Sequence, residues 1–418
     1  MTTNLFLAVG VIIILGLMGG AVASKLRLPR ITGYIIGGML LSPSLFHLVP
    51  KSSLHTLDPY VEVALSLIGY SIGGNLRFDA LRQWWRPIMG VTLLQGFGSW
   101  FLSTLVISLL GPFVLNLPDG TMQNTYFPVA FILGAISWAT APAVTLAVLH
   151  ECRVKGPVAT ILLAVVVITD AFAVIAFYFA EGMTRPLLSG AGIAFFYQVV
   201  LFPILQVIEA AGMGVVFGFA LAYGTAIVHS RSFLLLAIIG AVLLCQAVAG
   251  SIGTSSILAA MFAGFVAINK SRRDDLILVI EEIEDVIFVP FFVISGMYFD
   301  LDTMKVGTLL TFIIIITRCS GKYLGTYAGA ALTGAPEVFK KYLGFALLPK
   351  AGLTIGLAFL ARNLSPGLGD IMFNALLAST AINMLFTPPL ARFSIHKAAA
   401  LTEEKGRDHV SPARIERR

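Results

Sequence analysis

The segment Val167-Ile168-Thr169-Asp170-Ala171-Phe172 places one carboxylate in the middle of an apolar stretch that covers residues 158–180. A stretch of this length is long enough to cross the hydrocarbon core of a bilayer as an α-helix. A carboxylate at the centre of such a helix costs roughly 2.5–3.5 kcal/mol, and intramembrane acids usually lie on ion or proton pathways. The alternative is a structural role, in which the carboxylate makes a hydrogen bond that only fixes helix packing. The pattern favours an ion or proton pathway at Asp170.

The whole chain has the composition of a membrane protein. Of its 418 residues, 57% are hydrophobic and only 12% are charged, whereas soluble domains carry about 25% charged residues. We expect an all-α polytopic membrane protein of about thirteen transmembrane helices. The first is interpreted as a membrane helix and not as a signal peptide, because no cleavage pattern follows it. The predicted spans are 4–23, 31–48, 57–75, 85–111, 126–149, 158–180, 192–228, 232–250, 253–268, 284–299, 306–331, 338–361 and 369–391.

The Lys and Arg residues divide unequally between the two sides of these spans. Three lie in the interior of predicted spans, and four lie in loops on one side; all the others lie in loops or at span ends on the opposite side. Because basic residues favour the cytoplasmic side, we expect an external N-terminus and a cytoplasmic C-terminus in a bacterial-type inner or plasma membrane. This asymmetry also accounts for the net charge of +6 without a nucleic-acid partner. The four are Lys51, Arg185, Lys305 and Arg362, and the three are Arg318, Lys322 and Lys350.

Cysteine and histidine do not form a recognisable site. The three Cys and six His residues show no paired metal-ligand or redox spacing. An intramembrane enzyme would need a nucleophile beside a base or two paired carboxylates, and Asp170 is the single clear midplane carboxylate. We therefore expect no enzyme, no catalytic residue and no cofactor. The only metal expected is a transported monovalent cation at Asp170.

A weak internal repeat divides the chain. Glu62 corresponds to Glu284 and Gly74 to Gly296, and the two residues are equally far apart in each pair. Six spans in each copy and one between them make the second copy inverted, which is common in secondary transporters. The predicted transport domain, 1–391, comprises a first repeat (4–180), a linking helix (192–228) and an inverted repeat (232–391). A short basic tail, 392–418, follows.

Two spans are interrupted at corresponding positions of the two halves. The fifth contains Ser137-Trp138-Ala139-Thr140-Ala141-Pro142, and the twelfth contains Leu348-Pro349-Lys350-Ala351-Gly352. Broken helices free backbone carbonyls that can coordinate a cation, and their ends carry partial charges. Simple proline kinks are the alternative. We favour a transport site with Thr140 as its side-chain oxygen and with Ala141, Pro142, Pro349, Lys350 and Gly352 at the breaks.

Other charged residues have less certain roles. Arg318 and Lys322 lie one helical turn apart, and one of them, with Lys322 favoured, is expected to face Asp170 or the end of a half-helix. The alternative places both near the cytoplasmic rim. Lys350 could neutralise helix dipoles or face water. Glu62 and Glu209 are secondary acidic candidates, although a helix-capping or interfacial position suits them better.

Several motifs together resemble the monovalent cation:proton antiporter-2 family across nearly the whole chain. They are Leu28-Pro29-Arg30-Ile31-Thr32-Gly33-Tyr34-Ile35-Ile36-Gly37-Gly38-Met39, Thr140-Ala141-Pro142, Thr169-Asp170 and Phe291-Phe292-Val293-Ile294-Ser295-Gly296-Met297. The resemblance implies an NhaA-like antiporter fold, with two inverted six-helix repeats and two crossed discontinuous helices. It also implies a homodimer in the lipid membrane that works as an elevator. The family's essential aspartate falls on Asp170, and its core basic residue on Lys322 or Arg318.

The chain departs from this family at Thr169, where sodium-specific members resemble Asp-Asp and Kef-type potassium systems resemble Gln-Asp. It also has Gly352 where many relatives have glutamate, and the short tail is not expected to form a Kef-type nucleotide-binding domain. One carboxylate suggests electroneutral 1:1 exchange of Na⁺ or K⁺ for a proton, with both ions competing for Asp170. The alternatives are a sodium-coupled organic-solute symporter and a Kef-type potassium efflux system gated by a separate regulatory subunit.

Overall fold

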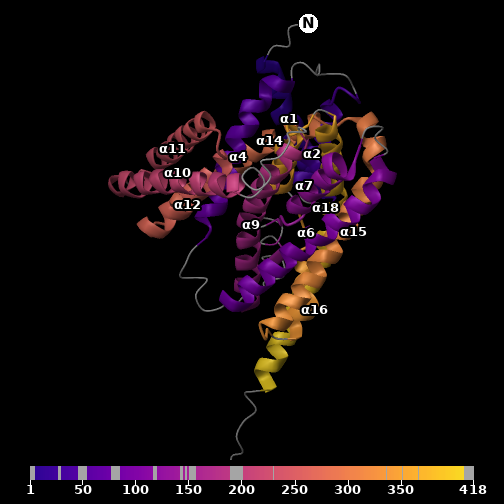
Figure 1. The fold of residues 1–418 in the computed structure, drawn as a ribbon. Coiled ribbons are helices and arrows are strands. Elements are labelled where there is room, and N and C mark those ends of the chain that lie inside the picture. The colour runs from indigo at the N-terminus through magenta and orange to yellow at the C-terminus, as the bar shows by residue number, and fades with distance from the viewer. Residues whose placement is uncertain are drawn as a thin grey trace, which may run out of the picture.

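The protein is described by a computed structural model that covers residues 5–26, 30–45, 54–76, 85–115, 120–141, 145, 148–149, 157–188, 201–228, 230–335, 337–350, 352–365 and 367–408. Its described residues form helices and connecting turns without a β-strand among them (Figure 1). The predicted all-α class is therefore confirmed.

The helices pack as two neighbouring groups (Figure 1). The panel, as we call the first group, contains α1 (Leu5–Lys25), α2 (Arg30–Leu41), η1 (His55–Leu57), α4 (Asp58–Gly74), α10 (Phe202–Gly224), η4 (Thr225–Ile227), α11 (Arg231–Ile252), α12 (Ser256–Ser271), α13 (Asp275–Glu281) and α14 (Glu284–Met297). The core bundle contains α6 (Trp85–Leu115), η2 (Met122–Tyr126), α7 (Phe127–Ile136), α9 (Pro157–Leu188), α15 (Leu301–Leu332), α16 (Glu337–Ala346), α17 (Gly352–Arg362) and α18 (Leu368–Asp408).

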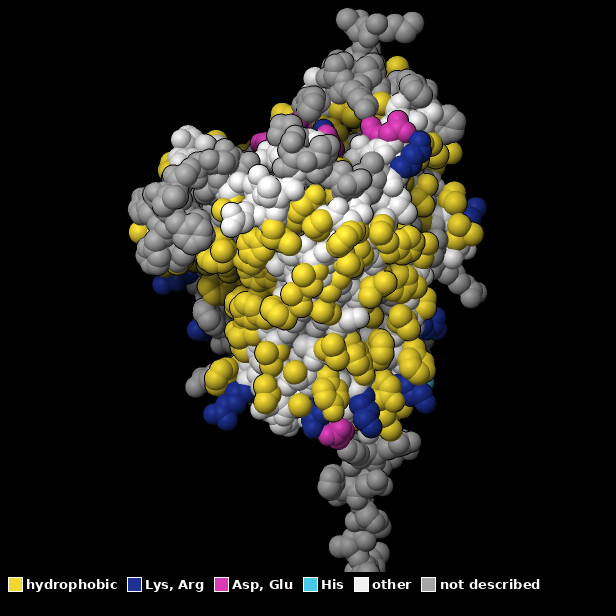
Figure 2. Space-filling model, turned by 45° about the vertical axis from the view of Figure 1, so that its right-hand side comes forward, with side chains coloured by type: hydrophobic (Ala, Val, Ile, Leu, Met, Phe, Trp, Pro, Cys, Tyr) yellow, Lys and Arg dark blue, Asp and Glu magenta, His cyan; other side chains and the backbone are white. Residues whose placement is uncertain are grey.

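The face of the molecule drawn in Figure 2 carries a belt of apolar side chains between bands that carry charged residues. Six described helices are long and apolar enough to cross a membrane, and several shorter apolar helices accompany them. The six segments are Leu7–Lys25, Trp85–Leu115, Ile161–Arg185, Ile204–Ile227, Arg231–Ile252 and Leu368–Ala398. The exposed belt and these spans are those of an integral membrane protein.

Glycines allow two close helix crossings in the panel. A β-carbon on Gly38 of α2 would lie 2.0 Å from the Val293 carbonyl oxygen of α14. Likewise, a β-carbon on Gly264 of α12 would lie 2.2 Å from the Tyr70 carbonyl oxygen of α4. Only glycine permits such backbone approach, which is a common way for membrane helices to associate.

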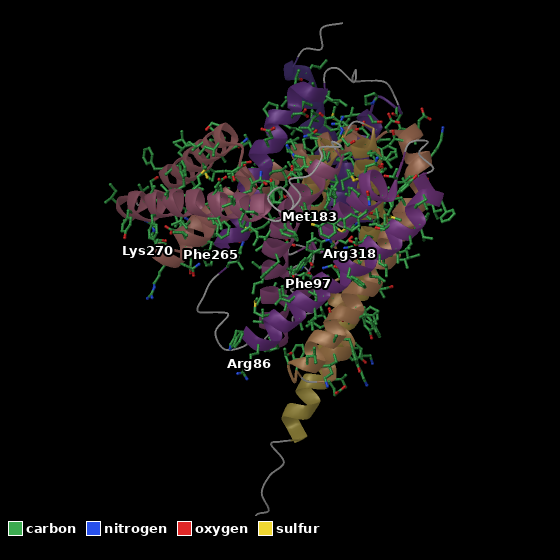
Figure 3. All side chains as sticks on the ribbon, viewed as in Figure 1. Arg86, Phe97, Met183, Phe265, Lys270 and Arg318 are labelled. Carbon is green, nitrogen blue, oxygen red and sulfur yellow. The ribbon has the colours of Figure 1, made fainter. Side chains whose placement is uncertain are left out.

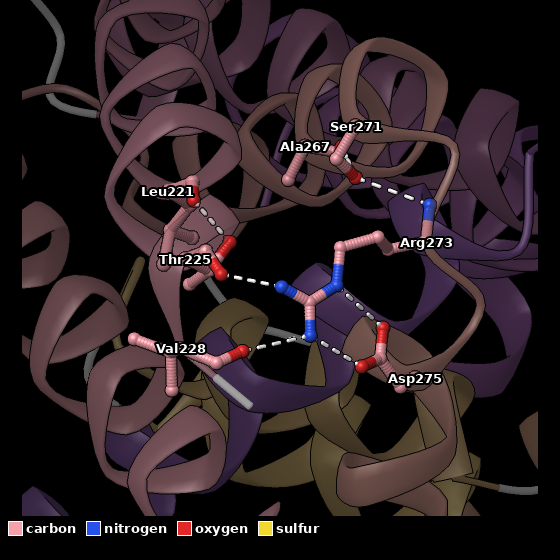
Figure 4. Close-up of polar contacts among 7 residues, drawn as sticks. All are labelled: Leu221, Thr225, Val228, Ala267, Ser271, Arg273 and Asp275. Atoms are coloured by element: carbon pink, nitrogen blue, oxygen red, sulfur yellow. Dashed lines mark hydrogen bonds and ion pairs between the residues drawn. The ribbon is translucent and has the colours of Figure 1, made fainter. Parts of the chain in front are cut away.

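An arginine ties α10 to the segment between α12 and α13. The guanidinium of Arg273 donates to the carbonyls of Thr225 and Val228, and it pairs with Asp275 at 2.6 Å (Figure 4). Since the last carbonyls of a helix have no partner within that helix, a cation is a favourable cap for them. The hydrogen bonds from Arg273 hold the pKa of Asp275 below its ordinary value.

Several helix boundaries differ from those expected. The linking helix is described from Phe202, and 192–200 lie outside the described residues. Helix α9 continues past residue 180 to Leu188. Helix α18 continues past residue 391, the expected end of the last span, to Asp408. Its alanine, lysine and glutamate residues favour helix, and Ile395 and Ala398 are buried against the core bundle.

Candidate functional site

The first broken helix ends in the middle of the core bundle. Helix α7 stops at Ile136, and Ala139, Thr140 and Ala141 are not helical. The sequence places proline at 142, which has no backbone N–H and disfavours helical backbone at the residue before it. The structure of Pro142 itself lies outside the described residues. The break leaves the carbonyls of Trp138 and Ala139 available for other donors.

The second broken helix is interrupted in the same way. Helix α16 ends at Ala346 and α17 begins at Gly352, with Pro349 and Lys350 buried between them. Gly352 packs near the ring of Phe292, since a β-carbon added there would lie 3.1 Å from that ring. The interruptions expected in the fifth and twelfth spans are thus both present in the described residues.

Lys322 of α15 binds the first break. Its ammonium donates to the Trp138 carbonyl at 2.7 Å, to Gln95 Oε1 at 2.8 Å and to Thr140 Oγ1 at 2.9 Å. These three bonds use all three N–H donors of an ammonium group. Lys322 is completely buried, so the predicted alternative at the cytoplasmic rim is wrong.

Arg318, one turn earlier in α15, joins the two breaks. Its guanidinium donates to the Ala139 carbonyl at 2.7 Å and to the Leu348 carbonyl at 2.6 Å. Ala139 follows α7 and Leu348 follows α16, so a single buried cation neutralises the negative ends of both half-helices. Figure 3 shows Arg318 within the core bundle, away from both ends of the molecule.

Asp170 of α9 lies at the first break and is only 1% exposed. Its Oδ1 accepts a hydrogen bond of 2.9 Å from the backbone N–H of Thr140. No ion pair within 4.0 Å connects Asp170 to a described lysine or arginine. Lys322 therefore reaches Asp170 through Thr140, and of the two partners expected from the sequence it directly contacts the end of a half-helix.

Thr169 belongs to the same network through Gln95 of α6. The Gln95 amide donates to Thr169 Oγ1 at 2.9 Å while its oxygen accepts from Lys322. Sequence reasoning missed Gln95. Its signal was an amide within an otherwise apolar predicted span, which requires hydrogen-bond partners when buried.

At the second break, Lys350 contacts α18. Its backbone N–H donates to Asn383 Oδ1 at 3.2 Å, and its ammonium donates to Ser379 Oγ at 2.6 Å. Lys350 is 1% exposed, so it does not face open water. Asn383 and Ser379 were not predicted from the sequence either.

The two secondary acidic candidates lie away from this network. Glu62 on α4 and Glu209 on α10 are both exposed and belong to the panel. The structure brings together Asp170, Thr169, Thr140, Ala141, Lys322 and Arg318 around the first break, with Pro349, Lys350 and Gly352 at the second. Such an arrangement offers a buried carboxylate that can bind either a proton or a cation.

The fold and the two breaks define a helical membrane transporter. The model of the family described as sodium/hydrogen exchanger, transmembrane, matches residues 10–393. The chain therefore belongs to this family, which is one of transporters, and the resemblance to cation:proton antiporters is confirmed.

Individual relatives are distant but match over long regions. The chain is 22% identical to the Na⁺/H⁺-K⁺ antiporter GerN of Bacillus cereus, covering 94% of this chain and 97% of that one. It is 25% identical to cation/H⁺ antiporter 19 of Arabidopsis thaliana over 93% of its own length, and it spans about half of that longer protein (50%). The solved structure of the sodium proton antiporter MjNhaP1 from Methanocaldococcus jannaschii at pH 8 has the same fold. The TM-score is 0.75 at 18% identity, with 94% of this chain and 98% of that one covered.

Proposed function

We propose that this protein is a secondary active antiporter that exchanges a monovalent cation, Na⁺ or K⁺, for a proton at Asp170. The observation that carries the proposal is a buried carboxylate held by the Thr140 N–H at a broken helix. The names of the relatives, which are cation/proton antiporters, support the same activity.

We propose a stoichiometry of one cation for one proton. Lys322 has an acceptor within reach of each of the three N–H groups of an ammonium, which supports a fixed positive charge there. With Lys322 fixed as a cation, Asp170 remains the exchanging group. A bound cation leaves the carboxylate ionised and a bound proton neutralises it, so both loaded forms of the site carry the same net charge. Loaded transport is then electroneutral.

The cation would bind at the first break. Asp170 supplies a carboxylate, and Thr140 and Thr169 supply hydroxyl oxygens beside it. Hydroxyl, carbonyl and carboxylate oxygens are the ligands that hard cations prefer. Lys322 and a cation then compete for Thr140 Oγ1, which would link cation binding to a shift of this hydrogen bond.

We further propose thirteen spans in two inverted repeats, and an elevator movement of the core bundle along the panel. The division of the helices into two packed groups supports the movement. The pair of glycine crossings, α2 on α14 and α12 on α4, supports the repeat, since each joins the first repeat to the second. A homodimer, an external N-terminus and a plasma-membrane location are part of this proposal.

The test is exchange in liposomes that contain a pH-reporting dye and an imposed proton gradient. Adding Na⁺, K⁺ or Li⁺ should collapse the proton gradient in liposomes that contain the unmodified protein. The measurement is made with and without a voltage clamp by an ionophore. The collapse should be independent of voltage and absent in Asp170→Asn. Asp302→Asn is a matched control, because Asp302 is an exposed carboxylate paired with Lys305 outside this network.

Other outcomes would contradict specific parts of the proposal. Collapse that depends on voltage would overturn the 1:1 stoichiometry. No collapse with any cation would overturn the antiporter and favour a sodium-coupled organic-solute symporter. Activity that requires an added cytoplasmic fraction would favour a potassium efflux system gated by a separate subunit. Conduction that persists in Asp170→Asn would indicate a channel.

A further inference from the structure

A cavity of about 280 Å³ lies at one end of the core bundle, and none of the residues that line it belongs to the Asp170 network. It lies between the first turns of α6, the turn after α15, and α16, with Ile161 of α9 contributing to its wall. Val91, Ile161, Phe339 and Leu343 line it with hydrocarbon. An apolar cavity of this kind suits a hydrocarbon chain better than a polar solute.

The lining also contains one cation, Arg86. Its guanidinium lies over the exposed ring of Trp85, 5.7 Å from the ring centroid. Among the described residues Arg86 has no carboxylate partner within 4.0 Å, and Glu337 at the start of α16 is paired with Lys340 instead. Helix α6 begins at Trp85, so its positive dipole end lies beside the same guanidinium.

This end of the bundle carries the features of a membrane–water boundary. Figure 3 shows Arg86 at the end of α6, and Figure 2 shows Lys and Arg side chains along the edge of the apolar belt at that end. A tryptophan beside an arginine is typical of this boundary. By the distribution of basic residues it is the cytoplasmic end, as proposed above.

We propose that this cavity binds one anionic phospholipid of the cytoplasmic leaflet, with its phosphate on Arg86 and the start of an acyl chain between Val91, Phe339 and Leu343. The charge at Arg86 requires an anion, and the hydrocarbon wall requires a chain attached to it. A phospholipid supplies both groups at the depth where the cavity lies.

The bound lipid would act on transport through α16. This helix lines the cavity with Phe339 and Leu343, and it leads directly to the Leu348 carbonyl that Arg318 holds. An acyl chain wedged between α6 and α16 fixes the position of that half-helix. Exchange should therefore be faster in vesicles that contain phosphatidylglycerol than in phosphatidylcholine alone.

The experiment measures lipid retention by native mass spectrometry, which does not depend on exchange activity. The unmodified protein should retain phosphatidylglycerol in preference to phosphatidylcholine, and Arg86→Ala should weaken that retention about fivefold. Arg86→Lys should restore part of it. Leu343→Trp, which fills the cavity, should remove it, with Leu343→Met as a volume-conserving control for folding.

Lys270→Ala is the matched control for surface charge. Lys270 also lies over aromatic rings, those of Phe219 and Tyr223, but on the panel and without the cavity. Equal losses in Arg86→Ala and Lys270→Ala would overturn the proposal in favour of general attraction to anionic lipid. Undiminished retention in a folded Leu343→Trp variant, or displacement of the lipid by inorganic phosphate alone, would overturn it too.

Discussion

At the first break the backbone N–H of Thr140 donates to the carboxylate of Asp170, and at the second break the backbone N–H of Lys350 donates to the amide of Asn383. The acceptor follows the donor by 30 residues in one half and by 33 in the other. Both acceptors come from the long helix that follows the broken one. The two breaks therefore share one backbone arrangement.

Their chemistry differs. The first half has a carboxylate that can bind either a proton or a cation. The second half has an amide, which stays neutral because it does not titrate. It also has the ammonium of Lys350, which is bound to Ser379. The difference teaches that two similar backbone arrangements can present different chemistry: the acceptor is a titratable carboxylate at one break and a neutral amide at the other.

The strongest way to break this comparison is to exchange the two acceptors. Asp170→Asn makes the halves alike, and exchange should fall by at least about a hundredfold, because the intramembrane carboxylate is lost. Adding Asn383→Asp should not restore it, since Lys322, Gln95 and Thr169 surround only the first half. The measurement is gradient collapse in liposomes. Recovery of exchange in the double variant would show that the halves are interchangeable.

The two lysines should differ in their contribution to stability. Lys322→Met removes three buried hydrogen bonds beside a carboxylate, and should cost on the order of 3 kcal/mol of unfolding free energy. Lys350→Met removes one described side-chain bond, and should cost about 1 kcal/mol. Thermal unfolding of the purified variants gives the order. A larger loss for Lys350→Met would place the main electrostatic support at the second break.

The two glycine crossings of the panel, unlike the two breaks, should respond alike to substitution. Gly38→Ala and Gly264→Ala place a β-carbon against a carbonyl oxygen at 2.0 and 2.2 Å, and each should destabilise the fold by about 1–2 kcal/mol. Gly240→Ala is the control, since a β-carbon there meets nothing within 4 Å. Unfolding temperatures test this prediction, which fails if only one crossing is sensitive.

The smallest effect on stability is expected at the pair of Arg273 and Asp275. Arg273 binds helix-end carbonyls as Arg318 does, but it lies near the surface and has a carboxylate partner. The pKa of Asp275 lies below its ordinary value of 3.8, so the pair stabilises the fold above about that pH. Its contribution is lost as the pH falls through the lowered pKa. Asp275→Asn should cost less than about 1 kcal/mol at neutral pH. The difference from the unmodified protein should disappear in acid; a difference that grows in acid would contradict the sign.

Much of the site could be predicted from the sequence because its signals are local. A carboxylate inside an apolar segment and a proline inside a predicted helix are both visible in a short window. Gln95 and Asn383 were missed because an amide inside an apolar span indicates only that it needs hydrogen-bond partners, and not which residues supply them. Which of its two expected partners Lys322 contacts was open for the same reason: its ammonium binds the Trp138 carbonyl after α7, and Thr140 lies between it and Asp170.

The sequence by itself determined the helical class, the apolar segments, the two breaks and the place of one carboxylate, Asp170, within an apolar helix. Hydropathy and backbone chemistry act over a few residues, which is why these features are readable. Only the tertiary structure decided which carbonyl each buried cation caps. The Arg318 bond to Ala139 joins residues 179 apart, and the Lys322 bond to Gln95 joins residues 227 apart. Contacts at such separations depend on helix packing, because it is packing that brings the two breaks together around one arginine.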